Sequence, residues 1–182
     1  MKHFIAILFC FVFTQSQPPL YTCRSVTTTI FSEAPLENID ATSTKGVSVL
    51  NPATGELQFS IPINSYQFQK SLMQEHFNEN YMESDKFPFA RFKGKINEKI
   101  DWKTPGNYQV TVNGDLEVHG VKQARSINGT VSITNSSVTV QSKFTVLCKD
   151  HHIDIPKIVF KNIAESIQVT VKANYTPSTA SK

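Results

Sequence analysis

The sequence predicts an all-β protein, an eight-stranded antiparallel up-and-down barrel with one amphipathic helix between the third and fourth strands. Three observations predict this class. Apolar and polar residues alternate with a period of two over most of the chain. Turn signals such as Asn51-Pro52 and Thr104-Pro105-Gly106 separate the alternating runs. Near residues 72–81, in contrast, the apolar period is helical.

Eight alternating runs are the predicted strands, and the fifth is the most regular of them. It places Tyr108, Val110, Val112 and Leu116 on one face, with polar residues between them. The predicted strands span about residues 21–31, 39–50, 57–63, 87–100, 108–118, 127–133, 138–148 and 167–175.

Eight one-faced strands must bury eight apolar faces, and one helix cannot cover them, so the sheet has to pack on itself. A two-sheet sandwich would also alternate. A barrel is favoured because the connections resemble successive hairpins, and because closure removes the exposed strand edges.

The predicted helix is followed directly by a strand. At about 100° per residue, Leu72, Met73, His76, Phe77 and Tyr81 share one side of the helix. Ser84, Asp85 and Pro88 end the helical pattern, and a period of two begins. Two alternatives stay open for this apolar side: it lines the mouth of the barrel, or it plugs the barrel end as ordinary core.

The N-terminus has the pattern of a secretory signal peptide. Lys2 and His3 precede the apolar run from Phe4 to Phe13, and Thr14 and Ser16 offer small residues for cleavage. We therefore expect a signal peptide at 1–17, a β-barrel domain at 18–176 and a flexible tail at 177–182. The expected location is periplasmic or secreted, without stable membrane insertion.

The net charge limits the classes of binding partner, and the cysteine content limits the possible disulfides. The net charge of +3 becomes +2 without Lys2, and no basic patch interleaved with aromatic residues occurs, so nucleic acid is not an expected partner. Export would leave Cys23 and Cys148, for which two buried free thiols are favoured over a disulfide. A homodimer stays an open alternative.

A search for catalytic motifs favours a protein that is not an enzyme and has no cofactor. The chain has no Gly-x-Ser-x-Gly elbow, no phosphate-binding Gly loop and no paired-Cys metal spacing. The alternative is an exported enzyme or metal-dependent protein that uses His76, Glu79, His151 and His152. His151 and His152 are adjacent, however, so in an extended segment they point to opposite sides.

Small residues recur near the middle of the predicted inner faces. They are Gly94, Gly114, Gly129, Ser142 and Ala173. If they line up across the barrel they leave a void for a slim ligand. The competing interpretation is that the glycines serve bulges or corners of the sheet.

Several runs resemble the secreted YceI-like family. One is SYQF at 65–68 together with LMQEHFNENYMESDKFPFARFKGKI at 72–96, and the others are GDLEVHGV at 114–121 and DHHIDIPKIVFKNIAESIQVTV at 150–171. Many members carry an Arg-Asp pair and a His-Leu pair in the helix region, which this chain lacks, so no head-group contact is carried over. The resemblance implies a lipocalin-like barrel that binds a polyisoprenoid or another long-chain amphiphile.

We therefore expect non-enzymatic binding, transport or sequestration of a polyisoprenoid or fatty-acid-like lipid in an apolar lumen, since each buried methylene contributes about 0.8 kcal/mol. The candidate ligand-binding residues are Phe59, Ile61, Phe68, Leu72, Met73, His76, Phe77, Tyr81, Phe92, Gly114, Leu116, Gly129, Val131, Ser142 and Phe144.

Overall fold

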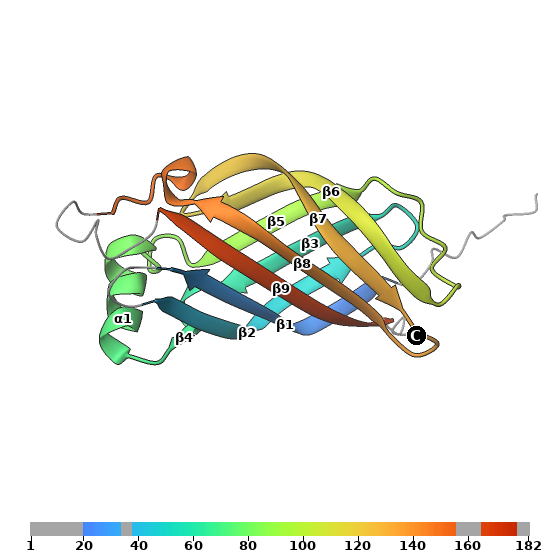
Figure 1. Cartoon of the computed structure of the whole chain (residues 1–182), viewed down its shortest axis with the longest axis horizontal. Helices are drawn as coiled ribbons and strands as arrows, with labels where there is room; N and C mark the ends of the chain where they lie inside the picture. Colours follow the sequence, from blue (N-terminus) through green and yellow to red (C-terminus); the bar gives the residue numbers. More distant parts are fainter. Residues whose placement is uncertain (1–19, 34–37, 156–164, 178–182) are drawn as a thin grey trace, which may run out of the picture.

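Long strands whose side chains alternate between buried and exposed build the molecule (Figure 1). The structure is a computed structural model that describes residues 20–33, 38–155 and 165–177. The long strands are β1 (Tyr21–Ser32), β2 (Ile39–Leu50), β3 (Glu56–Pro62), β5 (Phe89–Ile96), β6 (Gly106–Val118), β7 (Val121–Ile133), β8 (Val138–Leu147) and β9 (Ser166–Pro177).

These strands close into an eight-stranded barrel in chain order. Each of them pairs antiparallel with the next, and β9 pairs with β1, which also pairs with β2. Closure leaves no long strand with an unpaired edge. The predicted up-and-down barrel is thus confirmed.

The short elements gather at one end of the barrel, where the helix lies (Figure 1). Strand β4 (Gln67–Phe68) adds to β2 beyond the end of β3. Helix α1 (Ser71–His76) continues into a π-helical turn, η2 (Phe77–Tyr81). Two 3-10 turns complete the set, η1 (Ile63–Ser65) and η3 (Cys148–His151). We call this end, which also includes the turn that joins β6 to β7, the helix end.

The predicted bounds need correction in two strands, β5 and β7. Strand β5 is shorter than the predicted 87–100, because residues 97–105 form the turn into β6. Strand β7 begins at Val121, before the predicted start, because a turn at His119 and Gly120 joins it directly to β6. The predicted signal peptide at 1–17 and tail residues 178–182 lie outside the described residues.

The opposite end of the barrel, which we call the packed end, has a filled core. Leu50 is fully buried and Tyr175 is 1% exposed, and the rings of Tyr21 and Trp102 meet with their centroids 6.2 Å apart. Ser48 donates its hydroxyl proton to the carbonyl oxygen of Gln58, at 2.7 Å. The Tyr175 hydroxyl therefore donates to Ser48 Oγ, at 2.6 Å, so both of these hydroxyl groups donate a hydrogen bond.

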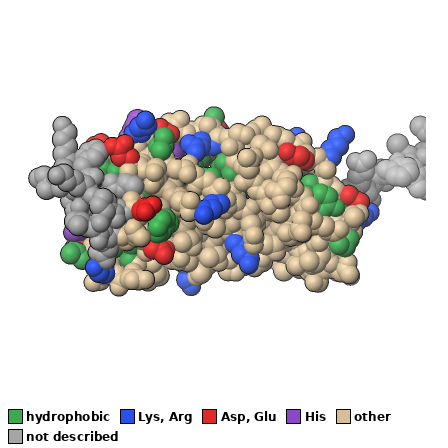
Figure 2. All heavy atoms as spheres, viewed as in Figure 1, with side chains coloured by type: hydrophobic (Ala, Val, Ile, Leu, Met, Phe, Trp, Pro, Cys, Tyr) green, Lys and Arg blue, Asp and Glu red, His purple; other side chains and the backbone are tan. Residues whose placement is uncertain are grey.

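The outer surface is mixed in charge. On the face in Figure 2, Lys and Arg side chains are spread singly along the barrel, whereas Asp and Glu side chains lie toward its two ends. This face has no uniformly basic area of the kind that binds nucleic acid. Among the described helices, none is both long and apolar enough to span a membrane.

Candidate functional site

The helix half of the barrel contains a cavity of about 210 Å³. A single buried water needs only about 10–15 Å³ of such space, so the cavity has room for a much larger molecule. Cavities lined by aliphatic and aromatic groups stay free of water. The lumen is therefore suited to a hydrocarbon group.

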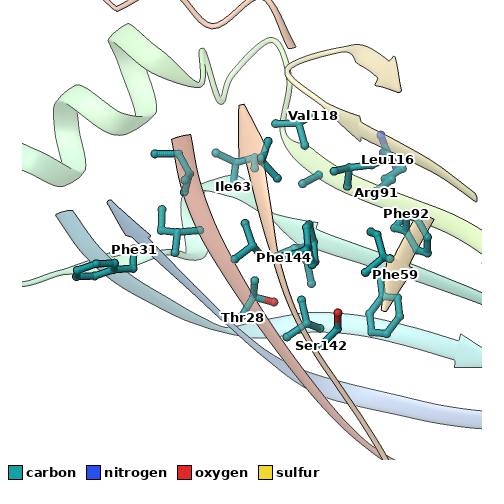
Figure 3. A pocket seen from close by; sticks show the side chains of 18 of the residues that line it. Thr28, Phe31, Phe59, Ile63, Arg91, Phe92, Leu116, Val118, Ser142 and Phe144 are labelled. Carbon is teal, nitrogen blue, oxygen red and sulfur yellow. The ribbon is translucent and has the colours of Figure 1, made fainter. Parts of the chain in front are cut away.

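Inward-facing positions of all eight long strands supply most of the wall (Figure 3). The strand residues on the wall include Ile30, Leu57, Phe59, Ile61, Phe92, Val112, Leu116, Ile127, Val131, Val140, Phe144, Val146, Ile167, Val169 and Val171. At the helix end the wall continues through Ile63, Tyr66, Phe77, Tyr81, Met82, Ile153 and Ile155.

Ten of the fifteen candidate ligand-binding residues line this cavity. They are Phe59, Ile61, Phe77, Tyr81, Phe92, Leu116, Gly129, Val131, Ser142 and Phe144. The strand residues among them lie together because alternation with a period of two sends every second side chain into the lumen. Their contact with a ligand stays a prediction.

The other candidates, Phe68, Leu72, Met73, His76 and Gly114, do not contribute to the cavity wall. Four of them precede Phe77, and Leu72 is 59% exposed. A regular helical period over residues 72–81 is wrong, because the chain changes to a π turn. There the Met82 amide donates to the Phe77 carbonyl at 2.9 Å, five residues back.

The wider turn changes the angular phase of the helix, so it presents its second half to the lumen. Phe77 packs against the rings of Phe68 and Tyr66, with centroids 5.0 and 5.7 Å away. Tyr81 and Met82 also line the cavity, and burial raises the pKa of Tyr81. Met82, which directly follows η2, is buried.

The small residues predicted to leave a void separate into two kinds. Gly94 and Gly114 are cross-strand partners in β5 and β6. A methyl group on Gly114 would lie 2.3 Å from the carbonyl oxygen of Lys93 and 2.5 Å from the Cα of Gly94. The ring of Phe92 occupies the space beside Gly94. These two glycines let the backbones of β5 and β6 approach each other closely. The expectation that Gly114 lines the void is wrong.

A second pair, Gly129 of β7 and Ser142 of β8, does face the cavity. Gly129 also allows a close approach, because a methyl group there would lie 2.8 Å from the Gln141 carbonyl oxygen. Ala173 is fully buried in the core and is not part of the wall. Missing side-chain volume therefore opens the lumen at β7 and β8 alone among the predicted positions.

Sequence reasoning missed two buried residues of the wall that carry hydroxyl groups, Thr28 and Tyr66. Thr28 is 2% exposed and Tyr66 is 5% exposed. Burial raises the pKa of Tyr66, and the nearby Thr28 hydroxyl offsets part of that rise. Alternation along β1 places Thr28 on the inner face, but no pattern marks Tyr66, which follows η1.

Among the described residues of the wall, Arg91 carries the one charged side chain. It alternates with Ala90 and Phe92 and so belongs to the outer face of β5. Its guanidinium lies 3.6 Å from the Glu117 carboxylate and 4.9 Å from the centre of the Phe89 ring. Its charge is therefore balanced outside the lumen.

The two cysteines are free, buried and at different ends of the barrel. Cys148 lines the cavity, whereas Cys23 belongs to the core of the packed end. Burial raises the pKa of the Cys148 thiol, and the nearby Glu165 carboxylate adds to the rise. The Cys148 side chain therefore contributes to the wall as a neutral group.

The histidines of the enzyme alternative do not form a site. His76 and His152 are exposed, whereas His151 is fully buried, with its Nδ1 3.0 Å from the Val121 carbonyl oxygen. Within the parts of the chain that the structure describes, no group of three His, Cys, Asp or Glu side chains could hold a metal ion.

A different histidine joins the loops at the helix end. His119 Nδ1 lies 3.2 Å from the His151 carbonyl oxygen, and its Nε2 lies 2.9 Å from Glu83 Oε2. The His119 ring packs on Phe87, with centroids 4.5 Å apart. These contacts connect the segment after η2 to the β6–β7 turn and to η3.

Comparison with known proteins agrees with the barrel fold. The chain is similar to the structure of a polyisoprenoid binding domain from Saccharophagus degradans, with a TM-score of 0.76 and 13% identity over 88% of this chain and 99% of that one. Burkholderia cenocepacia BcnA gives a TM-score of 0.69 and 14% identity, with 83% and 96% of the two chains covered.

The YceI protein of Campylobacter jejuni gives a TM-score of 0.52 at 14% identity, with 96% and 98% coverage. No curated protein sequence matches. The family model of the YceI-like domain matches residues 24–175, which include nearly all of the barrel. The chain therefore belongs to the YceI-like family.

Proposed function

We propose that this protein binds a long-chain amphiphile, polyisoprenoid or fatty-acid-like, inside the barrel and carries or sequesters it without covalent chemistry. The observation that carries the proposal is the cavity of about 210 Å³ with its almost wholly apolar wall. Burying a hydrocarbon chain there contributes about 0.8 kcal/mol per methylene. The description of the Saccharophagus degradans domain as polyisoprenoid binding supports the same ligand class.

The helix end is the proposed entrance. Phe77, Tyr81 and Met82 continue the apolar wall beyond the strands, whereas the packed end is filled around Leu50 and Tyr175. A chain that enters beside the helix would extend toward the middle of the barrel, where Leu57, Val131 and Val140 belong both to the cavity wall and to the buried core. Its head group would stay near the helix end.

Extraction of the purified protein into organic solvent, followed by mass spectrometry, tests the proposal. We expect a long-chain lipid from the wild-type protein. Ala90→Phe should abolish the extracted lipid, because Ala90 lines the cavity. The matched control is Ala124→Phe, which adds the same ring on the exposed side of β7 and should retain the lipid. Equal lipid content in both variants would contradict a binding site in the lumen.

Alkylation of the cysteines gives an independent test. Cys148 lines the cavity and Cys23 does not, so a bound chain should slow the reaction of Cys148 with iodoacetamide in the native protein. Cys23, which is buried in the packed end, is the internal reference. Equal protection of both thiols would indicate a general stabilisation of the barrel instead of occupancy of the lumen.

We further propose that the protein is exported and acts in the periplasm or outside the cell. The apolar run from Phe4 to Phe13 after Lys2 supports this. A mature N-terminus near Gln17 in the native host is the expected result of N-terminal sequencing. A protein that retains Met1 would contradict export. Light scattering would show whether the mature protein is a monomer or a homodimer.

A further inference from the structure

The wall of the lumen contains a buried hydroxyl group that has no hydrogen-bond partner among the described residues. The Oγ1 atom of Thr28 has no partner within hydrogen-bonding distance among the described residues. The nearby Tyr66 phenol is also buried in the wall. Buried hydroxyls normally have partners, because desolvation without a hydrogen bond costs free energy.

The buried hydroxyls of Ser43 and Ser48 do have hydrogen-bond partners. Ser43 Oγ lies 2.6 Å from Ser65 Oγ, and Ser48 bonds both Tyr175 and the Gln58 carbonyl. Ser32 Oγ is also without a partner, but Ser32 is not part of the cavity wall. Thr28 thus combines an unpartnered hydroxyl with a position on the lumen.

A polar acceptor lies on the same part of the wall. Thr28 and Ser142 are both register partners of Val171, one on each side of β9. Their hydroxyl oxygens stand among carbon side chains in Figure 3. Ser142 donates its proton to the Asn128 carbonyl at 2.6 Å, so the lone pairs of Ser142 Oγ can still accept a hydrogen bond.

No cation on the described wall can balance an anion inside the lumen. Arg91 is on the outer face and pairs with Glu117. A carboxylate or phosphate placed beside Thr28 would be a desolvated charge without a partner, which is strongly unfavourable. An uncharged oxygen would receive a hydrogen bond without this cost.

We propose, on the basis of the lipid-binding function proposed above, that the hydroxyls of Thr28 and Tyr66 are an internal recognition point for an uncharged oxygen group of the ligand. The ligand class is then a neutral chain molecule that carries a hydroxyl or carbonyl group into the lumen. Plain hydrocarbons lack the hydrogen-bonding group, and fatty-acid anions carry a charge that the lumen cannot balance.

Three probes of matched chain length test this inference on the full mature chain: tetradecanol, tetradecane and tetradecanoate. Each would compete with diphenylhexatriene, which fluoresces in apolar cavities. Tetradecanol should bind more tightly than the other two. Thr28→Val and Tyr66→Phe should each weaken tetradecanol binding about three- to ten-fold, the range for one hydrogen bond, and leave tetradecane affinity unchanged.

Two further variants are controls. Thr29→Val removes the neighbouring hydroxyl on the outer face, which lies 3.1 Å from Thr42 Oγ1, and should leave all three affinities unchanged. Thr28→Ser keeps the hydroxyl and should keep the preference for the alcohol. The Thr28→Val protein should unfold at the wild-type temperature or above it, because the substitution removes an unpartnered buried hydroxyl.

The outcomes separate the two proposals. If Thr28→Val lowers the affinity for tetradecanol and tetradecane equally, or lowers neither, the recognition point is wrong while the lipid-binding function still stands. Tightest binding of tetradecanoate would overturn the neutral ligand class. If diphenylhexatriene and all three probes fail to bind, the lipid-binding function itself is wrong, and the recognition point with it.

Discussion

The two ends of the barrel contain similar residues in different arrangements, and the two buried tyrosines show the difference. At the packed end, the Tyr175 hydroxyl donates to Ser48, which in turn donates to a backbone carbonyl. At the helix end, Tyr66 faces Thr28, whose hydroxyl has no partner among the described residues. The packed end has hydrogen-bonded hydroxyls and a filled core, whereas the helix end contains the cavity and the unpartnered hydroxyl of Thr28.

The largest expected effect is on core packing. Leu50 is fully buried at the packed end, and Leu116 is 6% exposed and borders the cavity. Leu50→Ala should lower the free energy of unfolding by about 4–5 kcal/mol, and Leu116→Ala by about 2–3 kcal/mol, within the range for buried leucines. The loss is smaller at Leu116 because one side of that leucine already faces empty space.

Urea unfolding with equal slopes for the two variants measures this difference. Leu116→Ala also enlarges the lumen, so it should retain or strengthen diphenylhexatriene binding. Equal destabilisation by the two substitutions would mean that the helix end is packed as tightly as the other end.

The next effect concerns the two glycine pairs. A methyl group in Gly114→Ala would meet the Lys93 carbonyl and the Gly94 backbone, so we expect a loss of about 2–3 kcal/mol in unfolding free energy. Gly129→Ala should cost about 1 kcal/mol, since its tight contact is with one carbonyl oxygen, at 2.8 Å.

Lipid affinity should also distinguish the two glycine pairs. Gly129 lines the cavity and Gly114 does not, so lipid affinity per folded molecule should fall in Gly129→Ala only. Chemical unfolding together with diphenylhexatriene titration checks both expectations. Reduced lipid affinity in Gly114→Ala would show that the close approach of β5 and β6 shapes the lumen.

The strands could be predicted from the sequence because each has one buried face, and burial with a period of two is written directly in the residue order. Val112 and Leu116 of β6, for example, were assigned to one face of the strand, and both line the cavity. Closure of the sheet into a barrel could also be predicted, since eight apolar faces had to be covered.

Much of the helix end could not be predicted, because its geometry depends on contacts between distant segments. The π turn after His76 changes which residues face the lumen, and no local pattern in Phe77–Tyr81 distinguishes a π turn from an α-helix. A glycine in a strand is equally ambiguous: Gly114 and Gly129 look alike in sequence, but only one borders the cavity.

The tyrosines predict a smaller, pH-dependent difference. Burial raises the pKa of both Tyr66 and Tyr175 above the usual value near 10. Above about pH 10 the unfolded chain ionises these groups while the folded barrel keeps them protonated, so stability should fall as pH rises. Each tyrosine contributes a slope of about 1.4 kcal/mol per pH unit.

Urea unfolding at several alkaline pH values measures this slope. Tyr66→Phe and Tyr175→Phe should each flatten it by a similar amount. An unchanged slope in both core variants would contradict the raised pKa values.

At neutral pH the same two substitutions should differ, and this is the smallest effect. Tyr175→Phe removes the donor to Ser48 in a filled core, so the free energy of unfolding should fall by about 1 kcal/mol. Tyr66→Phe removes a hydroxyl that makes no close hydrogen bond within the described residues, and it should change stability by less than about 0.5 kcal/mol. Thermal and urea unfolding of both variants in the lipid-free state would measure the contrast. A loss of equal size in Tyr66→Phe would show that the Tyr66 hydroxyl stabilises the empty barrel. The difference between the packed end and the helix end would then depend on the cavity alone.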